Sequence, residues 1–331
     1  MKYGLLGERL KHSLSPEIHA LYGNDDYELI EVAKDKAREF ITAKNYKGVN
    51  VTIPYKELAF ELCDEVSPKA AEIGSVNTII VREDNSLYGD NTDYYGFLYM
   101  ASTGNIEFRN KKVVIMGSGG TGKTAYAAVK DNGAKEIVIL SRRDGISYED
   151  KEAYRDADIL INTTPVGMYP HNGEKLVDIK DFSNLEGVLD VVYNPLRTAL
   201  LLQAEELKIP YAGGLPMLTE QARRGAEMFL SKSIPPEVGD KVYIKIRQRF
   251  GNIVVVGNES IAMVIGAELR RPVVTGGNWE DIAKEKSLIL SVSEAAAKKH
   301  HNALRQNGVF LTDKVLQSGK ARKIENILRK L

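Results

Sequence analysis

Short apolar runs alternate with longer amphipathic stretches over the first hundred residues. The apolar runs include GVNVTI and SVNTIIV, and the amphipathic stretches include KDKAREFITAKNY and KELAFELCDEV. Brief apolar runs are typical of buried strands, whereas apolar positions that recur at helical spacing indicate helices. Strands that alternate with helices predict an α/β fold with a largely parallel, helix-covered sheet, not a bundle or a sandwich.

A second series of the same kind begins at Lys111. It reads KKVVIMGSGGTGKTAYAAVKDNGAKEIVILSRR, continues through ADILINTTP and GVLDVVYNP, and closes near PYAGGL. The stretch STGNIEFRN separates the two series as a linker, and the helical run PMLTEQARRGAEMFLSK ends where Pro235 and Pro236 stop it. A third series opens with RFGNIVVVGNESIAMVIGAEL. We therefore expect one domain at 1–100 completed by a helix at 217–235, a second at 101–216, and a small α/β appendage at 250–331.

Composition excludes several classes of protein. The 331 residues carry 45 basic and 45 acidic side chains, and no apolar run approaches the ~18 residues of a membrane helix. The N-terminal MKYGLLGERLKHS lacks the apolar core of a secretory signal, so we expect a cytoplasmic protein without a membrane partner. Cys63 is the single cysteine, and the pairs His12/His19 and His300/His301 form no metal signature, so we expect no disulfide and no metal.

The balanced total charge hides an excess of basic residues near the C-terminus. Residues 250–331 hold 13 basic and 8 acidic side chains. The stretch KARKIENILRK spaces its charges around Ile324, Ile327 and Leu328, as an amphipathic helix does. This spacing favours a solvated helix over a nucleic-acid surface, and we expect no nucleic-acid partner.

The segment from Gly117 to Thr124 matches two phosphate-binding motifs. Gly117, Gly119 and Gly122 satisfy GxGxxG, whereas Gly117, Gly122, Lys123 and Thr124 satisfy GxxxxGK[ST]. Both motifs place phosphates at a helix N-terminus, but the first predicts a dinucleotide enzyme and the second a nucleoside-triphosphate enzyme.

The ends of the following strands distinguish these two motifs. In a dinucleotide-binding Rossmann fold the next strand ends at the adenosine ribose, where an acid selects NAD and an arginine accommodates NADP. Here EIVILSRR supplies Arg142 and Arg143 and no acid. A phosphate-loop enzyme would need an aspartate at the end of a later strand for Mg²⁺, and ILINTTP supplies Asn162. The pattern favours a Rossmann domain that binds NADP.

Unusual polar positions in the first hundred residues are candidates for holding a substrate. Each also has a structural explanation, since Ser15-Pro16 could begin a helix, Lys56 could be a solvated first-turn lysine and Asp93 could cap a helix or a turn. The remaining candidates in this region are Ser13, Thr52 and Asn77.

Taken together, the motifs resemble a known family. HSLSPEIH, GVNVTIPYK, GSVNTI, GDNTDYYGF, GSGGTGK, NTTPVGM, DVVYNP and GGLPMLTEQA occur in the order typical of shikimate 5-dehydrogenase, over residues 1–235. The resemblance implies an NADP-dependent oxidoreductase that interconverts 3-dehydroshikimate and shikimate in chorismate and aromatic amino-acid biosynthesis. The family's usual Asn-Arg-Thr after the second cofactor strand is Ser141-Arg142-Arg143 here, and the added arginine favours NADP.

The resemblance also implies roles for individual residues. Lys56 and Asp93 would be the catalytic pair, in which the lysine donates a proton to the nascent alkoxide and the aspartate holds it. The substrate would be bound by Ser13, Ser15, Thr52, Asn77, Tyr193 and Gln221. The cofactor would be bound by Gly117, Ser118, Gly119, Gly120, Thr121, Ser141, Arg142, Arg143, Val191 and Gly214.

Residues 250–331 resemble the opening of shikimate kinase, but without its phosphate loop. Gly257 is followed by NESIAMV where that family has a GKS or GKT ending, and Ser260 comes too early for the metal position. We expect a decayed kinase-like domain that transfers no phosphate and whose deletion leaves dehydrogenase activity substantially intact.

Other interpretations stay open at this point. The chain could be an ATP-using kinase through Gly117–Thr124, or a metabolite sensor without catalysis, although a sensor would be free to lose Lys56 and Asp93. The sequence does not decide whether the substrate is shikimate or quinate, or whether the protein is a homodimer or a monomer.

Overall fold

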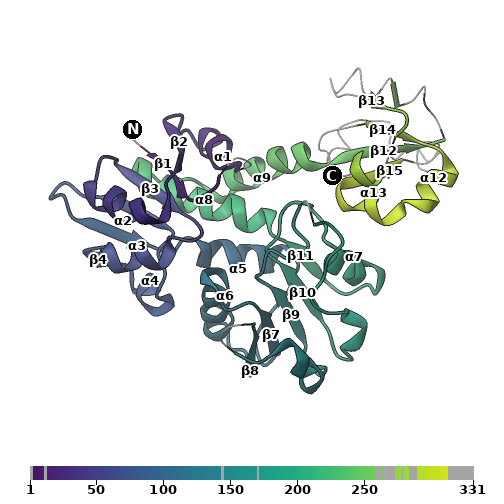
Figure 1. Cartoon of the computed structure of the whole chain (residues 1–331), viewed down its shortest axis with the longest axis horizontal. Coiled ribbons are helices and arrows are strands. Elements are labelled where there is room, and N and C mark those ends of the chain that lie inside the picture. The colour runs from purple at the N-terminus through teal and green to yellow at the C-terminus, as the bar shows by residue number, and fades with distance from the viewer. Residues whose placement is uncertain are drawn as a thin grey trace.

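The computed structural model describes residues 3–10, 13–142, 145–169, 171–257, 259, 262–263, 265, 273–277, 279–282 and 289–311. In these residues the strands form three sheets, each with its own helices (Figure 1). The α/β class expected from the sequence is confirmed. None of the described helices is long and apolar enough to cross a membrane.

The first sheet has the strand order β2-β1-β3-β5-β6-β4. Its strands are β1 (Tyr3–Gly7), β2 (Tyr27–Glu31), β3 (Gly48–Val51), β4 (Glu65–Val66), β5 (Thr78–Val81) and β6 (Leu87–Asp90), and its helices are α1 (Ser15–Leu21), α2 (Lys34–Ala43), α3 (Lys56–Leu62) and α4 (Pro68–Ile73). Every pairing is parallel except those of β5, which runs antiparallel to β3 and β6. The reversal brings the carboxyl ends of β3 and β6 to the edge where β5 begins.

The second sheet has the order β11-β10-β9-β7-β8, and all its strands are parallel. Its strands are β7 (Lys112–Met116), β8 (Glu136–Leu140), β9 (Ile159–Asn162), β10 (Gly187–Asp190) and β11 (Tyr211–Gly213), and its helices include α6 (Gly120–Asp131) and α7 (Ala199–Glu206). These strands are apolar almost throughout, as expected for a parallel sheet covered on both faces. The strand order reverses between β7 and β9, so a ligand crevice is expected at their carboxyl ends.

Two helices connect the first and second sheets. They are α5 (Asp93–Thr103) and α8 (Leu215–Leu230), which pack against each other. Gly96 permits this close approach, because a Cβ atom at that position would lie 2.6 Å from the carbonyl oxygen of Met217. The helix expected at 217–235 therefore exists as α8, with bounds shifted toward the N-terminus.

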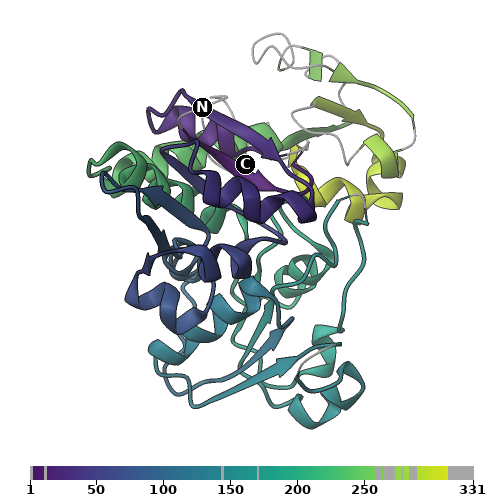
Figure 2. The same cartoon turned by 60° about the vertical axis from the view of Figure 1, so that its left-hand side comes forward.

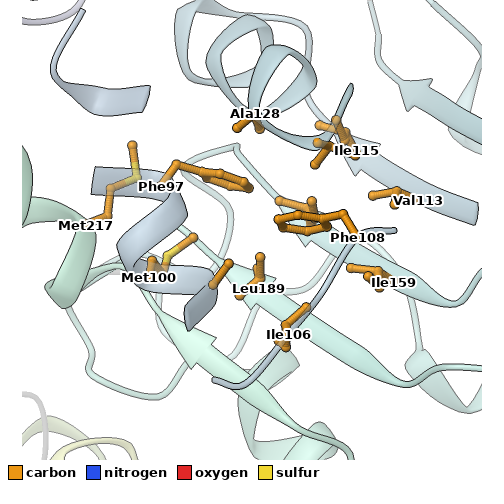
Figure 3. Close-up of a cluster of buried hydrophobic side chains, with 14 of the residues drawn as sticks. Phe97, Met100, Ile106, Phe108, Val113, Ile115, Ala128, Ile159, Leu189 and Met217 are labelled. Carbon is orange, nitrogen blue, oxygen red and sulfur yellow. The ribbon is translucent and has the colours of Figure 1, made fainter. Parts of the chain in front are cut away.

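A cluster of buried apolar side chains joins these helices to the second sheet (Figure 3). Phe97 and Met100 of α5, Met217 of α8 and Leu189 of β10 all belong to this cluster. The remaining labelled side chains of the cluster are Ile106, Phe108, Val113, Ile115, Ala128 and Ile159. The cluster therefore packs α5 and α8 against the second sheet.

A third sheet follows the long helix α9 (Pro236–Phe250). Its described strands are parallel in the order β13-β14-β12-β15, with β12 (Asn252–Val256), β13 (Val273–Val274), β14 (Ile289–Val292) and β15 (Gly308–Leu311). Its helices with described bounds are α11 (Trp279–Ile282), α12 (Glu294–Lys299) and α13 (His301–Asn307). We call the described part of residues 251–311 the C-terminal module; Figures 1 and 2 show it beside the second sheet, on the side of α7. The amphipathic stretch KARKIENILRK lies outside the described residues.

Candidate active site

Lys56 and Asp93 form an ion pair and a hydrogen bond between Nζ and Oδ2. Their side chains are only 14% and 10% exposed. Lys56 is the first residue of α3, and Asp93 is the first residue of α5. An ammonium and a carboxylate so enclosed are poised to exchange a proton with one small bound molecule.

The reversed strand β5 explains why these residues meet. Thr52 follows β3, Asn77 precedes β5, and Asp93 begins the helix after β6. The backbone N–H of Tyr55 donates a hydrogen bond of 2.9 Å to the carbonyl of Thr52. This bond closes a turn that leads directly into Lys56. The geometry of the first sheet therefore collects all four predicted positions at one edge.

Asn77 is buried and holds the residue that precedes Asp93. Its Oδ1 accepts the backbone N–H of Thr92 at 2.7 Å, and its Nδ2 donates to the Thr92 hydroxyl at 3.0 Å. The Thr78 hydroxyl also donates to Asn77 Oδ1, at 3.1 Å. Sequence reasoning missed Thr92 and Thr78, because a threonine beside a motif carries no signal of its own until the network is seen.

Ser13 and Ser15 lie together at the start of α1. The Ser13 hydroxyl donates to the Ser15 hydroxyl at 3.2 Å and accepts the Ser15 backbone N–H at 3.2 Å. The N-cap of α1 is Leu14, which has no side chain that could cap, so the helix-cap explanation of Ser15 is wrong. Ser15 is buried, at 6% exposed.

Gln221 lies on α8, and Tyr193 lies in the segment between β10 and α7. Gln221 sits on α8 against Gly96 of α5, where a Cβ atom would lie 3.2 Å from the Gln221 Cβ. Its Nε2 donates to the Leu218 carbonyl at 2.8 Å. Tyr193 is half-buried, and its ring meets that of Phe250 edge-on, with centroids 6.0 Å apart. Burial raises the pKa of Tyr193, so its hydroxyl stays protonated at neutral pH.

The glycine loop forms a cradle between β7 and α6. Gly117 has φ of 110°, and a Cβ there would lie 2.7 Å from the Thr163 hydroxyl. A Cβ at Gly122 would overlap the Gly117 carbonyl, whereas one at Gly119 would meet nothing within 4 Å. The loop is tightly packed at Gly117 and Gly122 and has open space at Gly119. A backbone that binds a pyrophosphate needs both the tight turn and the open space.

The same loop lies beside the Lys56–Asp93 pair. A Cβ atom at Gly120 would lie 3.6 Å from the Lys56 Cδ. At the other end of the loop, the hydroxyls of Ser118 and Ser141 share a hydrogen bond of 2.8 Å. The half-buried Thr121 follows in α6, exposed Arg142 comes directly after Ser141, and Arg143 lies outside the described residues.

The side chains needed for a phosphate loop are engaged elsewhere. Lys123 pairs with Glu57 of α3, on the neighbouring domain. The Thr124 hydroxyl donates to the Gly120 carbonyl at 3.0 Å, and Thr124 is 1% exposed. Both groups already have partners within the protein, so the geometry disfavours an ATP site at Gly117–Thr124.

Val191 and Gly214 meet at the carboxyl ends of β10 and β11. The Gly214 backbone N–H donates to the Val192 carbonyl at 3.0 Å, and a Cβ at Gly214 would overlap the Val191 carbonyl. These positions border the crevice expected between β7 and β9.

Asp190, at the end of β10, is a buried group that sequence reasoning missed. It accepts hydrogen bonds from the Thr198 hydroxyl at 2.6 Å, Asn162 Nδ2 at 3.0 Å and the Val192 backbone N–H at 3.1 Å. Burial raises its pKa to about 7, although these hydrogen bonds act in the opposite direction. The carboxyl group ties the segment after β10 to the end of β9.

The described residues contain no group of three or more His, Cys, Asp or Glu side chains that could hold a metal ion. A dinucleotide fits better, because the cradle of Gly117 and Gly122 and the exposed Arg142 offer backbone donors and a cation to phosphates.

Comparisons with known proteins agree with this geometry. A family model described as "Shikimate dehydrogenase substrate binding domain" matches residues 5–79. The chain is 37% identical over 267 residues to the shikimate dehydrogenase (NADP(+)) of Clostridium beijerinckii, covering 75% of this chain and 98% of the relative.

Solved structures give the same picture. Shikimate dehydrogenase 1 from Peptoclostridium difficile is similar with a TM-score of 0.67 and 34% identity, covering 74% of this chain and 98% of that protein. Shikimate 5-dehydrogenase from Thermus thermophilus, solved in complex with NADP(H) and shikimate, has a TM-score of 0.65 and 27% identity, covering 74% of this chain and 99% of that protein. These relatives leave about a quarter of this chain unmatched, so they lend no support to a kinase-like segment at 250–331.

Proposed function

Because this chain belongs to the shikimate dehydrogenase family, we propose that it is an NADP-dependent oxidoreductase that interconverts 3-dehydroshikimate and shikimate. The observation that carries the proposal is the enclosed Lys56–Asp93 pair, which lies directly beside the cofactor loop at Gly120. In this proposal, proton transfer and phosphate binding occur at adjacent positions.

The proposed chemistry divides between cofactor and protein. NADPH, when bound, supplies the hydride to the ketone carbon. Lys56 donates a proton from Nζ to the oxygen that becomes the hydroxyl, and Asp93 accepts a hydrogen bond from the same ammonium and fixes its direction. In the oxidation of shikimate the pair takes the hydroxyl proton instead. Because the two groups interact directly, the pH profile belongs to the pair and not to either residue.

The substrate would lie at the edge of the first sheet. We assign its carboxylate to the hydroxyls of Ser13 and Ser15, and its hydroxyls and ring to Thr52, Asn77, Tyr193 and Gln221. Both Oδ1 and Nδ2 of Asn77 hydrogen-bond to Thr92. In the proposal Asn77 therefore contacts the substrate and also positions Asp93, which follows Thr92.

The cofactor would lie along the second sheet. We assign the pyrophosphate to Gly117, Ser118, Gly119, Gly120 and Thr121, the ribose to Ser141, and the 2′-phosphate to Arg142 and Arg143. The nicotinamide would approach Val191 and Gly214, at the carboxyl ends of β10 and β11.

The finer predictions from the sequence remain proposals. They are the domain bounds 1–100 with 217–235, 101–216 and 250–331, a cytoplasmic location, and a homodimer. The kinase-like origin of residues 250–331 has one supporting feature: the parallel sheet places its first strand β12 in an interior position, followed by Gly257 at φ 76°. Most of the NESIAMV turn, including Ser260, lies outside the described residues.

Initial rates with shikimate or quinate, each against NADP or NAD, test the proposed function. We expect the highest kcat/KM for shikimate with NADP. A higher value for quinate would favour a broader quinate/shikimate dehydrogenase, and no reduction of NADP by either substrate would contradict the assignment. Turnover of ATP without any NADP reduction would instead favour the kinase alternative.

A further inference from the structure

The segment 191–198, which links β10 to α7, receives contacts from the C-terminal module. It carries Val191 and Tyr193 of the proposed site and ends at Thr198, which Asp190 holds. Besides its hydrogen bonds to Asn162, Tyr169 and Gly214, the segment has contacts with residues outside the part of the chain that resembles a dehydrogenase.

Helix α13 and strand β15 bind one side of this segment. The Arg197 backbone N–H donates to the Gln306 carbonyl at 3.1 Å, and Arg197 Nη2 donates to the Gly308 carbonyl at 2.7 Å. Arg305 forms ion pairs with Glu205 at 2.6 Å and Glu206 at 3.4 Å, at the end of α7. Figures 1 and 2 both place α13 against this part of the second domain.

Gln306 also reaches the loop after β9. Its Oε1 accepts a hydrogen bond from Asn172 Nδ2 at 2.8 Å, and Gln306 is only 7% exposed. This loop in turn contacts the segment 191–198, because the Tyr169 backbone N–H donates to the Asn194 carbonyl at 2.9 Å. Gln306 therefore contacts two loops, the segment 191–198 through its backbone carbonyl and the loop after β9 through its side-chain amide.

Phe250 supports the segment from the other side. It is the last residue of α9, is 1% exposed, and meets the ring of Tyr193 edge-on at an interplanar angle of 89°. The preceding residue, Arg249, forms an ion pair of 2.8 Å with Glu17 of α1, close to Ser15. The junction between α9 and the C-terminal module thus touches two elements of the proposed substrate site.

We propose that the end of α9 and the C-terminal module together position the segment 191–198, with Phe250 of α9 and Gln306 of the module as positioning residues for Tyr193 and therefore for substrate binding. Loops are the mobile parts of most domains, and a loop held in its binding conformation loses less entropy when a ligand arrives. The contacts reach the segment from two directions, and Phe250 and Gln306, which make two of them, are themselves buried, which suits this role. The proposal rests on the proposed function, because it assigns Tyr193 to the substrate.

Point variants of the full chain test the proposal. Gln306→Met keeps the length of the side chain but removes the acceptor, so we expect a roughly three- to ten-fold rise in KM for shikimate, the effect of one hydrogen bond. We expect kcat to stay within about two-fold, because the lost interaction affects binding and not the chemical step. Gln306→Glu retains an acceptor for Asn172 and should restore much of the wild-type KM.

A double-mutant cycle tests whether the change in KM depends on the hydrogen bond between Asn172 and Gln306. If Asn172 acts through Gln306, Asn172→Ala and the double variant with Gln306→Met should show the same KM as Gln306→Met alone. Phe250→Leu, which retains apolar volume but loses the ring edge, should also raise KM for shikimate. Asn302→Ala, at an exposed position of α13, is the matched control and should change nothing.

Backbone amide exchange of residues 191–198 supplies a readout independent of activity. We expect faster exchange in Gln306→Met and Phe250→Leu than in the wild type and in Asn302→Ala. Unchanged exchange and unchanged KM in both variants would overturn the positioning role while leaving the proposed function intact. A wild type that does not reduce NADP with shikimate would refute the proposed function, and the exchange data would still decide whether the module holds the segment.

Discussion

The ammonium of Lys56 is the proton donor on which turnover should depend most. We expect Lys56→Ala to lower kcat by ~10²-fold or more, the usual contribution of a positioned acid or base, with little change in the affinity for NADP. Steady-state rates and NADP titration measure both quantities. Lys36→Ala, at an exposed ion pair on α2, is a control that should behave as the wild type. Near-normal turnover of Lys56→Ala would remove this residue from the mechanism.

Arg142 should determine the preference for NADP over NAD. A hydrogen bond to a charged group contributes about 1.5–3 kcal/mol, so Arg142→Ala should raise KM for NADP by roughly ten-fold or more and leave KM for NAD almost unchanged. Kinetics with both cofactors measure the difference. Arg155→Ala, at an exposed ion pair with Glu152, is the control. Equal effects on both cofactors would show that another residue contacts the 2′-phosphate.

Asp190 should make the stability of the protein depend on pH. Its folded pKa is raised from 3.8 to about 7, so between these values the folded state binds more protons than the unfolded state. The free energy of unfolding should therefore fall as pH rises from about 4 to about 7, by at most about 1.4 kcal/mol per pH unit.

The variant Asp190→Asn isolates this effect. The buried ring of His19 has the opposite influence, because burial lowers its pKa to about 3, and its contribution to stability is lost as pH falls below its ordinary value of 6.5. Since His19 is present in both proteins, the difference between their pH profiles reports Asp190 alone. Denaturant unfolding at pH 5 and pH 7 should show a smaller decline with pH in Asp190→Asn, and identical slopes would refute the raised pKa.

At the scale of elements, the crossing of α5 and α8 positions both domains around the site. Asp93 begins α5 and Gln221 sits on α8, so their separation depends on how closely the two helices approach at Gly96. The network of Asn77, Thr78 and Thr92 then fixes the start of α5 against the first sheet.

We expect Gly96→Ala to destabilise the protein by about 1–3 kcal/mol, because the added methyl group forces the helices apart in a packed interior. The same shift should lower kcat/KM for shikimate, since Asp93 and Gln221 move with their helices. Thermal unfolding and steady-state rates measure the two effects. Ser102→Ala, at an exposed position of α5, is the control. A variant with wild-type stability and activity would show that the helices tolerate a wider separation.

At the scale of the whole molecule, the C-terminal module contacts the segment 191–198 and the end of α7, and its sequence has no intact phosphate loop. We expect the full-length protein to transfer no phosphate from ATP to shikimate, because Gly257 is followed by NESIAMV, which supplies neither the lysine nor the metal-binding hydroxyl at the required place. Incubation with labelled ATP and shikimate tests this expectation. Product formation that is abolished by substitutions within residues 257–264 would contradict it.

The structure also changes the design of any deletion. A cut at residue 250, as the sequence alone suggests, removes Phe250 from the core that α9 forms with α1 and α8. A cut after Gly251 retains that ring and removes only the module. Comparing the two truncations would separate the loss of core packing from the loss of the contacts at Arg197.

Local patterns determined a large part of this protein. Strands such as KVVIM and GVLD and the glycine loop at Gly117–Gly122 follow from short stretches of sequence, because steric and hydrogen-bonding preferences act between near neighbours. The expected stop at Pro235 and Pro236 is wrong, because α8 ends at Leu230, before the left-handed Ser231, and Pro236 begins α9. The ordered motifs were specific enough to identify the family, and the comparisons confirm that identification.

Only the tertiary structure decided how distant groups pair. The reversal of β5 brings Thr52, Asn77 and Asp93 to one edge, and no local pattern specifies the direction in which a strand enters a sheet. Lys123 could have served a phosphate until its partner Glu57 was seen on another domain. Asp190, Phe250 and Gln306 carry no motif, because their importance comes from burial and from partners that the chain brings close only after it folds.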